Sequence, residues 1–202
     1  MKLPVNHIYS SSYDLDFGYL LYEKVLERKP KIIYDIGVLQ GYSTACLGCA
    51  AKQIGAKVVA VDLFEDYKYK NCPQEKFESN MRDVGVMDAI EVKKMSVEEW
   101  LDLNIQCDFV HLDISNTGRS LVNFFKNVKG KPFILFEGGS TERDENMWVI
   151  KYKKSKITET LKEHGFSYEL LKSNNYEHKG QKVYRSLSCI DLNTPNALNL
   201  PK

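Results

Sequence analysis

Short apolar runs alternate with amphipathic segments along most of this 202-residue chain, and this alternation constrains the fold more than any other feature. Parallel strands need a long crossover between them, usually a helix, and the resulting sheet is covered on both faces. The segments expected to be strands are 31–36, 57–61, 89–93, 107–112 and 132–136. The segments expected to be helices are 14–29, 43–54, 73–84, 120–128 and 157–164, with a further helix after the capping-box sequence at 96–99.

The last two expected strands, 167–171 and 182–190, follow each other with no helix between them. We expect them to pair as an antiparallel hairpin at one edge of the sheet, joined by the polar loop 172–181. The predicted fold class is α/β: a Rossmann-like doubly wound sheet of seven strands, mostly parallel, with a C-terminal antiparallel strand hairpin. The length fits one domain over 1–202, with an N-terminal extension and helix (1–30), a core (31–190) and a surface tail (191–202).

Composition excludes several classes of protein. The formal net charge of +1 gives no reason to expect binding to nucleic acid or to an anionic membrane. No apolar run approaches the roughly 18 residues of a membrane span, and the first seven residues do not resemble a secretory signal. Five cysteines, an odd number, do not suggest a disulfide framework. We therefore expect a cytoplasmic protein with no membrane or nucleic-acid partner.

The most informative motif is YDIGVLQGYS at 34–43, directly after the first expected strand. Glycines here let the backbone turn sharply and let a ligand approach the main chain. A dinucleotide fingerprint reads G-x-G-x-x-G, whereas this chain has D-x-G-x-x-x-G. The carboxylate of Asp35, just before Gly37, suits a ligand with an ammonium group better than one with a pyrophosphate.

This motif resembles the first motif of class I S-adenosylmethionine-dependent methyltransferases, in particular the small O-methyltransferase-like branch. The resemblance extends from about residue 30 to about residue 190, with VVAVD at 58–62, MSV at 95–97 and CDFVHLD at 107–113 in the expected order. It implies that Asp35 lies near the methionine amino group and that Asp62 accepts hydrogen bonds from the ribose hydroxyls. The residues that it implies for cofactor binding are Asp35, Gly37, Gly41, Ser43, Asp62, Met95, Ser96 and Asp113.

The expected catalytic residues are Asp113, Glu137 and His178. Asp113 and Glu137 end the fourth and fifth expected strands, where metal-dependent O-methyltransferases hold a divalent cation, so Mg²⁺ is a second cofactor to consider. Asn116 is an uncertain third ligand, and neither acid is followed by the further ligands that relatives often carry. His178, in the loop expected between the last two strands, is the candidate base, although a histidine in a polar run is more often solvated.

Several other patterns have a structural reading. His111 is expected to be a satisfied core residue, and the C-x-x-C pair Cys46 and Cys49 is expected to pack in the core rather than to bind zinc. The basic run 151–156 is expected to be solvated, with contact to an acidic substrate as the alternative. The segment 136–144 is either a strand-to-helix turn with surface charges or a close approach to a ligand.

The leading hypothesis is methyl transfer from S-adenosylmethionine to a small acceptor, with a hydroxyl of a sugar or other metabolite as the expected site. The alternatives are an inactive cofactor-binding or scaffold protein and a nicotinamide-dependent oxidoreductase, which the missing G-x-G-x-x-G disfavours. A nucleic-acid amino-methyltransferase is disfavoured because the fourth strand lacks an Asp/Asn-Pro-Pro-aromatic motif. Residues 1–13 and the rim loops are expected to bind the acceptor, and a homo-oligomer remains open.

Overall fold

The structure is a computed structural model that describes residues 3–10 and 16–194. The chain divides into two units, Met1–His111 and Leu112–Lys202. Part of the expected acceptor segment 1–13, and residues 195–202 of the expected surface tail, lie outside the described residues. The expectation of a single domain over 1–202 stays a prediction.

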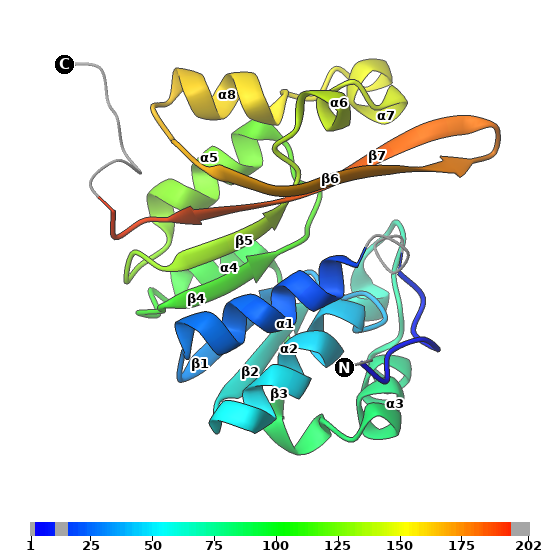
Figure 1. The fold of residues 1–202 in the computed structure, drawn as a ribbon, viewed down its shortest axis with the longest axis vertical. Coiled ribbons are helices and arrows are strands. Elements are labelled where there is room, and N and C mark those ends of the chain that lie inside the picture. The colour runs from blue at the N-terminus through cyan, green and yellow to red at the C-terminus, as the bar shows by residue number, and fades with distance from the viewer. Residues whose placement is uncertain (1–2, 11–15, 195–202) are drawn as a thin grey trace. The chain divides into compact units, whose positions relative to one another are not determined.

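The first unit alternates strands and helices (Figure 1). Its strands are β1 (Ile32–Ile36), β2 (Lys57–Asp62), β3 (Ile90–Lys94) and β4 (Phe109–Leu112), whose last residue belongs to the second unit. Its helices are α1 (Phe17–Arg28), α2 (Tyr42–Ile54), α3 (Gln74–Val84) and α4 (Val97–Asp102), with 3-10 turns η2 (Phe64–Asp66) and η3 (Met87–Ala89). Strands β1, β2 and β3 pair in parallel, so their carboxyl ends share one edge of the sheet.

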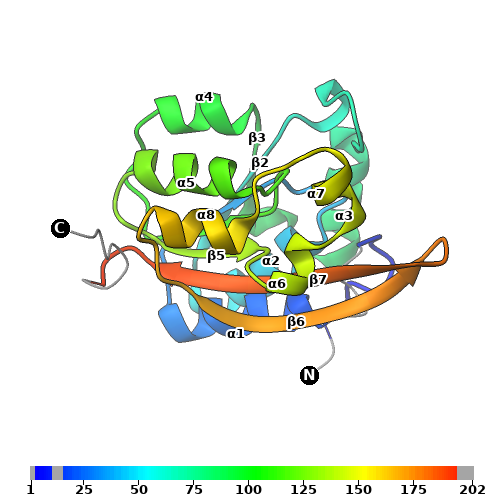
Figure 2. The ribbon, with the colours of Figure 1, turned by 90° about the horizontal axis from the view of Figure 1, so that it is seen from above.

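The second unit carries the antiparallel end of the sheet. Its strands are β5 (Phe133–Glu137), β6 (Glu169–His178) and β7 (Gln181–Asp191). Its helices are α5 (Gly118–Asn127), α6 (Thr141–Asp144), α7 (Met147–Lys151) and α8 (Ile157–Glu163). Helices α5 and α8 lie side by side (Figures 1 and 2), and Phe125 packs edge-on against Phe136 of β5 and against Phe166.

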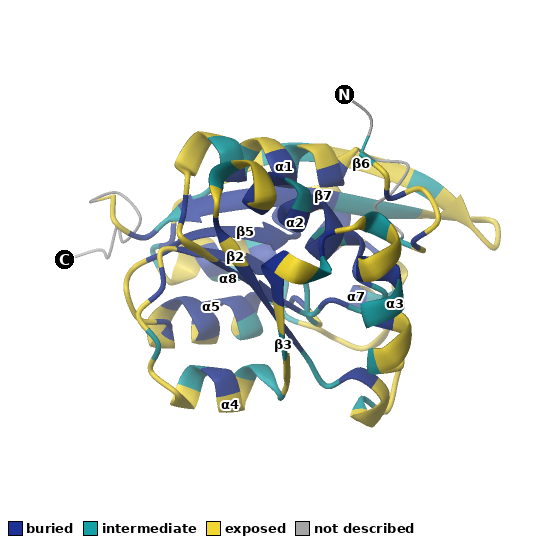
Figure 3. Cartoon of the chain, turned by 90° about the horizontal axis from the view of Figure 1, so that it is seen from below, coloured by how far each residue is buried: buried dark blue, intermediate teal, exposed yellow. Residues whose placement is uncertain are grey.

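The seven strands follow the order β3-β2-β1-β4-β5-β7-β6, with β7 antiparallel to both β5 and β6. This order confirms the predicted α/β class and the C-terminal hairpin. Strands β2 and β5 are apolar except for charged residues at their ends, and they are mostly buried, as Figure 3 shows in dark blue. A strand buried on both faces reads as a continuous apolar run, which is why the core strands are visible in the sequence.

The polar loop predicted over 172–181 is wrong. Strand β6 continues to His178 and β7 begins at Gln181, so only Lys179 and Gly180 form the turn (Figure 1). Both turn residues have positive φ, 51° and 72°, as a type I′ hairpin turn requires. The residues of β6 are mostly exposed, so no alternation of apolar and polar residues marks the strand in the sequence.

The other expected strand and helix ends after residue 30 differ by one or two residues from those in the structure. Within 3–10 and 16–194, no helix has both the length and the apolar character needed to cross a bilayer.

Candidate functional site

Asp35 lies in β1 with 0% of its surface exposed. Its Oδ2 accepts hydrogen bonds from the hydroxyls of Ser43 (2.9 Å) and Thr44 (2.6 Å) in the first turn of α2. Its Oδ1 lies 2.7 Å from Nδ1 of His111 on β4. The carboxylate is thus engaged by three side chains of the chain itself. Asp35 therefore joins β1, α2 and β4 within the first unit, and its expected place near the amino group of a ligand stays a prediction.

Asp62 ends β2, and its carboxylate holds the glycine loop, residues 37–41. Oδ2 accepts hydrogen bonds from the backbone N–H groups of Val38 (2.8 Å) and Leu39 (3.0 Å), and Oδ1 accepts one from Phe64 (2.8 Å). An ionised carboxylate has about four lone-pair sites, so about one is left for a ligand hydroxyl. Asp62 therefore fixes the shape of the loop as well as offering an acceptor at the carboxyl end of β2.

Gly41 is required by packing within the first unit. Its φ is +90°, and a Cβ at this position would lie 2.5 Å from Cε of Met81 and 2.9 Å from the ring of Phe77, both on α3. Asn80 of the same helix donates a 2.8 Å hydrogen bond to the carbonyl of Gln40. Helix α3 therefore packs closely against the backbone at Gly41 and supports the glycine loop.

Met95 and Ser96, two of the expected cofactor-binding residues, follow β3 and are held in different ways. The N–H of Met95 donates to the carbonyl of Asp62 (3.0 Å), which places Met95 at the carboxyl end of β3 next to β2. Ser96 forms the predicted capping box of α4: its hydroxyl and its N–H both donate to Oε2 of Glu99, at 2.8 Å and 2.7 Å. Its side chain is therefore committed to the helix cap.

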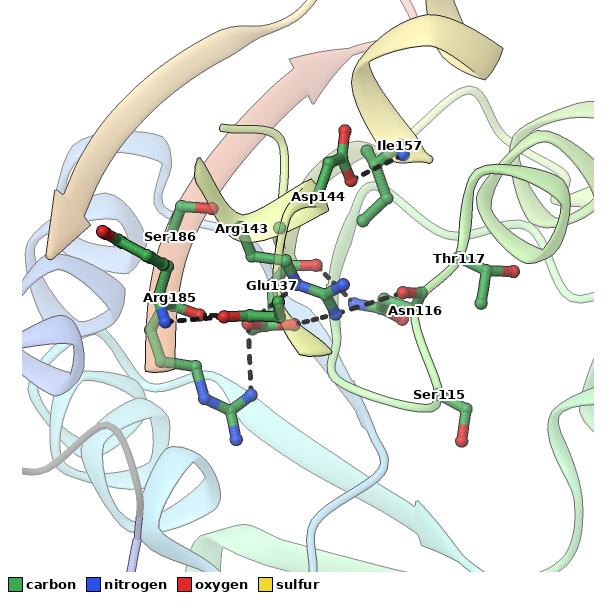
Figure 4. A network of polar contacts seen from close by, with 12 residues as sticks. Ser115, Asn116, Thr117, Glu137, Arg143, Asp144, Ile157, Arg185 and Ser186 are labelled. Atoms are coloured by element: carbon green, nitrogen blue, oxygen red, sulfur yellow. Dashed lines mark hydrogen bonds and ion pairs between the residues drawn. The ribbon is translucent and has the colours of Figure 1, made fainter. Parts of the chain in front are cut away.

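In the second unit, Glu137 ends β5 and is only 3% exposed. Arg143 on α6 donates to both carboxylate oxygens, from Nη2 at 2.9 Å and from Nε at 3.5 Å, and Arg185 on β7 reaches Oε1 with Nη1 at 3.1 Å (Figure 4). Burial alone would raise the pKa of Glu137, but the charges of the two arginines outweigh burial and hold that pKa below its usual range.

The two arginines differ in their surroundings. Arg143 is 3% exposed, donates a further 3.1 Å hydrogen bond to the carbonyl of Asn116 and lies 4.6 Å over the ring of Trp148. The side chain of Arg185 is 25% exposed. Burial disfavours its charge, but the carboxylates of Glu137 and Asp113 outweigh burial and raise its pKa. Asp113, which is half-buried, therefore belongs to the same cluster of charges.

Asn116, the uncertain third metal ligand, is 0% exposed. Its amide group donates to the carbonyls of Leu112 (3.0 Å) and Glu137 (2.8 Å), so it links the ends of β4 and β5. Its Oδ1 has no hydrogen-bond partner among the described residues. Within that part of the chain, no three His, Cys, Asp or Glu side chains are grouped so as to hold a metal ion.

The segment after Glu137 is a strand-to-helix turn, as one of the two readings predicted. A Cβ at Gly138 or Gly139 would meet protein atoms, Cδ1 of Ile157 at 2.3 Å and Oγ of Ser188 at 2.4 Å. The packing of the turn against Ile157 and Ser188 therefore requires glycine at both positions. The expectation of surface charges is wrong for Asp144, which is 1% exposed and accepts hydrogen bonds at the start of α8.

His178 is exposed and is the last residue of β6, opposite Gln181. Glu137 pairs with Leu187, six residues further along β7. At about 3.3 Å per residue, His178 lies about 20 Å along the hairpin from Glu137. The structure therefore does not bring the two expected catalytic residues together, and it gives no support to His178 as the base.

The remaining structural readings agree with the fold. His111 is a buried, hydrogen-bonded core residue, as expected. Cys46 is buried and Cys49 is half-buried on α2, consistent with core packing. Residues 151–154 of the basic run are exposed, and Lys156 pairs with Glu145 and Glu159.

Sequence reasoning missed Thr44, Arg143 and Arg185. Thr44 directly follows Ser43 at the start of α2, so its place beside Asp35 was accessible from the motif. Arg143 comes six residues after Glu137, a spacing that one turn and a short helix bring together. Arg185 lies 48 residues after Glu137 in the sequence and had no local signal, because only the pairing of β5 with β7 brings it near.

Comparison with known proteins identifies both the fold and the family. The family model described as "Methyltransferase domain" matches residues 34–134. No curated protein matches the chain. Among solved structures, the O-methyltransferase TomG from Streptomyces achromogenes, involved in tomaymycin synthesis and solved with SAM, has a TM-score of 0.60 at 14% identity, over 92% of this chain and 82% of that one.

Two further solved structures have a similar fold. An O-methyltransferase from Bacillus cereus in complex with SAH has a TM-score of 0.59 at 17% identity, over 93% of this chain and 84% of that one. A precorrin-6y C5,15-methyltransferase from Geobacter metallireducens has a TM-score of 0.60 at 10% identity, over 94% of this chain and 97% of that one. The family model covers the glycine loop, β2 with Asp62, and β4 with Asp113, and on this match the chain belongs to the methyltransferase-domain family.

Proposed function

We propose that this protein transfers a methyl group from S-adenosylmethionine to an oxygen atom of a small acceptor. The observation that carries the proposal is the glycine loop 37–41, anchored on the carboxylate of Asp62 and leading into helix α2. Membership of the methyltransferase-domain family supports methyl transfer. The similar folds of proteins solved with SAM or SAH support the choice of cofactor.

The residues of the first unit fit the chemical groups of this cofactor. Helix α2 has 13 residues, and the N–H groups of its first turn suit the carboxylate of the methionine part. Asp62 offers a lone pair to a ribose hydroxyl, and the half-buried Met95 offers an apolar surface to adenine. Asp35 and Ser43 contribute indirectly, because the hydrogen bond between them fixes the start of α2. Ser96 contributes through the position of α4.

S-adenosylmethionine, when bound, would supply a methyl group activated by its positively charged sulfur for transfer to an oxygen nucleophile. The chain contributes positioning and exclusion of water. Asp113 is the half-buried carboxylate of the second unit that we assign to accept the proton of the acceptor hydroxyl. Glu137 is a positioning residue in this proposal, because its carboxylate is held by Arg143 and Arg185.

The acceptor is proposed to be a hydroxyl-bearing metabolite such as a sugar. The two O-methyltransferases of similar fold support oxygen as the atom that receives the methyl group. The precorrin enzyme of similar fold is named for a different acceptor. We also propose a cytoplasmic location, because all five cysteines are free thiols. Two further points stay predictions: a possible homo-oligomer and the lack of a nucleic-acid partner.

A second candidate function is a cofactor-binding protein without transfer activity. Two observations favour it: both carboxylate oxygens of Glu137 are occupied by arginines, and His178 lies far along the hairpin. The two functions share the cofactor site and differ only in turnover.

The test is calorimetric titration with S-adenosylhomocysteine of the wild-type protein and of Asp62→Ala, with the exposed Asp83→Ala as the matched control. We expect micromolar binding in the wild type and in Asp83→Ala, and binding at least about tenfold weaker in Asp62→Ala, a loss of about 1.4 kcal/mol. No binding to the wild type would reject the proposal, and titration with NADH would follow. Binding without product formation across a panel of hydroxylated metabolites would favour the non-catalytic alternative.

A further inference from the structure

Asp113, directly after β4, and Glu137, at the end of β5, are the two acidic residues that a metal-dependent relative would use to bind its cation. We infer that the cluster of Glu137, Arg143 and Arg185 takes the place of a divalent cation in this chain, so that it transfers methyl groups without a metal. The inference deepens the proposed function and rests on it, because it assumes that the protein transfers methyl groups. The absence of a cation site is tested separately.

A cation would have to compete with arginines for both oxygens of the Glu137 carboxylate. Arg143 donates to both of its oxygens, and Arg185 donates to one of them (Figure 4). Mg²⁺ demands near-octahedral coordination at about 2.0–2.1 Å, a distance at which it would displace these donors. Arg143 is 3% exposed, so displacement would leave a buried guanidinium without its counter-charge.

Together with Asp113, the cluster already has balanced charges. Asp113 and Glu137 supply two negative charges, and Arg143 and Arg185 supply two positive ones, with Asp113 close enough to Arg185 to raise its pKa. A divalent ion would have to enter beside two fixed cations, which repel it. The donor set therefore disfavours a metal through its charge as well as through its geometry.

The other oxygens near the two strand ends do not replace Glu137. Asn116 is 0% exposed, and its amide is held by the carbonyls of Leu112 and Glu137. Mg²⁺ keeps several of its waters in protein sites, and a hydrated ion cannot reach a fully buried Oδ1. Asp113 remains as a single half-buried ligand.

Arg185 is the member of the cluster that solvent can reach. Its side chain is 25% exposed, whereas the side chains of Arg143 and Glu137 are each 4% exposed. Arg185 therefore presents a positive charge of the cluster near Glu137 at the end of β5, and Glu137, itself held by Arg143, keeps it in place. A guanidinium can donate hydrogen bonds to an acceptor oxygen, but it does not ionise that oxygen as a bound Mg²⁺ would.

The first experiment measures cation binding to the purified full-length protein, with electron paramagnetic resonance for Mn²⁺ and calorimetry for Mg²⁺, each with and without S-adenosylhomocysteine. We expect no binding below the millimolar range and no change in melting temperature with either ion. Submillimolar Mn²⁺ binding that is lost in Asp113→Asn would overturn the inference. Binding that persists in Asp113→Asn lies elsewhere on the chain and leaves the inference standing.

The second experiment asks whether Arg185 occupies the place of the cation. Arg185→Ala removes the accessible guanidinium, and the exposed Arg119→Ala on α5 is the matched control. We expect Arg185→Ala to bind Mn²⁺ at least about tenfold more tightly than the wild type, and Arg119→Ala to behave as the wild type. No gain in Arg185→Ala would show that Arg185 does not stand in for the ion. If Arg185→Ala does not fold, Arg185→Gln gives the same comparison.

These measurements do not depend on turnover. If S-adenosylhomocysteine fails to bind, the proposed function fails while the result on cation binding still stands. Once an acceptor is known, the enzyme treated with a chelator should retain the full rate of the untreated enzyme, and a loss of rate restored by Mg²⁺ would contradict transfer without a metal.

Discussion

The Nδ1 atom of His111 lies 2.7 Å from the carboxylate of Asp35, and both residues are buried in the first unit. The pair joins β4 to β1, and the hydroxyls of Ser43 and Thr44 extend it to the first turn of α2. The start of the helix that follows the glycine loop is therefore fixed by a network that no ligand needs to touch.

Replacing His111 by leucine should destabilise the protein. The change removes a hydrogen bond to a buried carboxylate, and bonds of this kind contribute about 1.5–3 kcal/mol to the free energy of unfolding. Urea denaturation of wild type and His111→Leu measures the difference. Binding of S-adenosylhomocysteine should weaken as well, because the loop loses part of its support.

The matched control for this prediction is His164→Leu. His164 is exposed and contacts Lys126, so its loss should change the free energy of unfolding by less than about 0.5 kcal/mol. Equal effects of the two substitutions would contradict the role assigned to the buried pair.

Asp62 should protect two backbone amides of the glycine loop from hydrogen exchange. Its Oδ2 accepts from the N–H groups of Val38 and Leu39, and Leu39 holds a positive φ of 50°. In Asp62→Ala these two amides should exchange at least about tenfold faster, because each loses its acceptor. The amide of Ala56, which donates to the carbonyl of Ala51 away from the glycine loop, serves as the internal reference. Unchanged exchange at Val38 and Leu39 would show that the loop keeps its shape without Asp62.

The Glu137 ion cluster should make stability depend on pH. Arg143 and Arg185 hold the pKa of Glu137 below its usual range, so the carboxylate stabilises the folded state above the unfolded pKa of about 4.3, and this contribution is lost as pH falls through the folded pKa. Glu137→Gln should cost about 3–5 kcal/mol at pH 7, because it leaves two arginines without their counter-charge. The difference in unfolding free energy between wild type and Glu137→Gln should shrink as the pH falls below 4. A difference independent of pH would exclude this account.

The sequence predicted the core strands and the order of elements because β1, β2 and β5 are short, mostly apolar runs that alternate with helical segments. It predicted β7 to within one residue at each end but did not predict the length of β6. The residues of β6 are mostly exposed, so hydrogen bonds to β7 and the geometry of the turn decide its conformation, and its side chains show no apolar alternation.

The positions of the motif residues were predictable, but their partners were not. Asp35 and Asp62 lie at the ends of the strands where the motifs put them, yet both carboxylates bind the chain itself. A motif shows which side chains reach one edge of the sheet. It cannot show that Arg185, from a strand 48 residues away, neutralises Glu137, since that contact depends on the register of β5 and β7.

The turn after Glu137 should tolerate no side chain, in contrast to the hairpin turn of the same unit. Gly139 has a φ of +97°, and a Cβ there would lie 2.4 Å from Oγ of Ser188 and 2.8 Å from Cε2 of Tyr168. Gly180 has a φ of +72° with nothing within 4 Å, so Gly180→Ala carries only the backbone strain of about 1 kcal/mol.

Gly139→Ala carries the same strain together with overpacking, which typically adds about 1–3 kcal/mol. In chemical denaturation, the free energy of unfolding of Gly139→Ala should therefore be well below that of Gly180→Ala. Ser140 caps the helix that carries Arg143, so Gly139→Ala should also weaken the ion pair between Arg143 and Glu137. The loss of stability should therefore be larger at pH 7 than at acid pH. Equal losses in the two variants would mean that the turn can shift without disturbing the arginine, and that the ion cluster does not depend on this glycine.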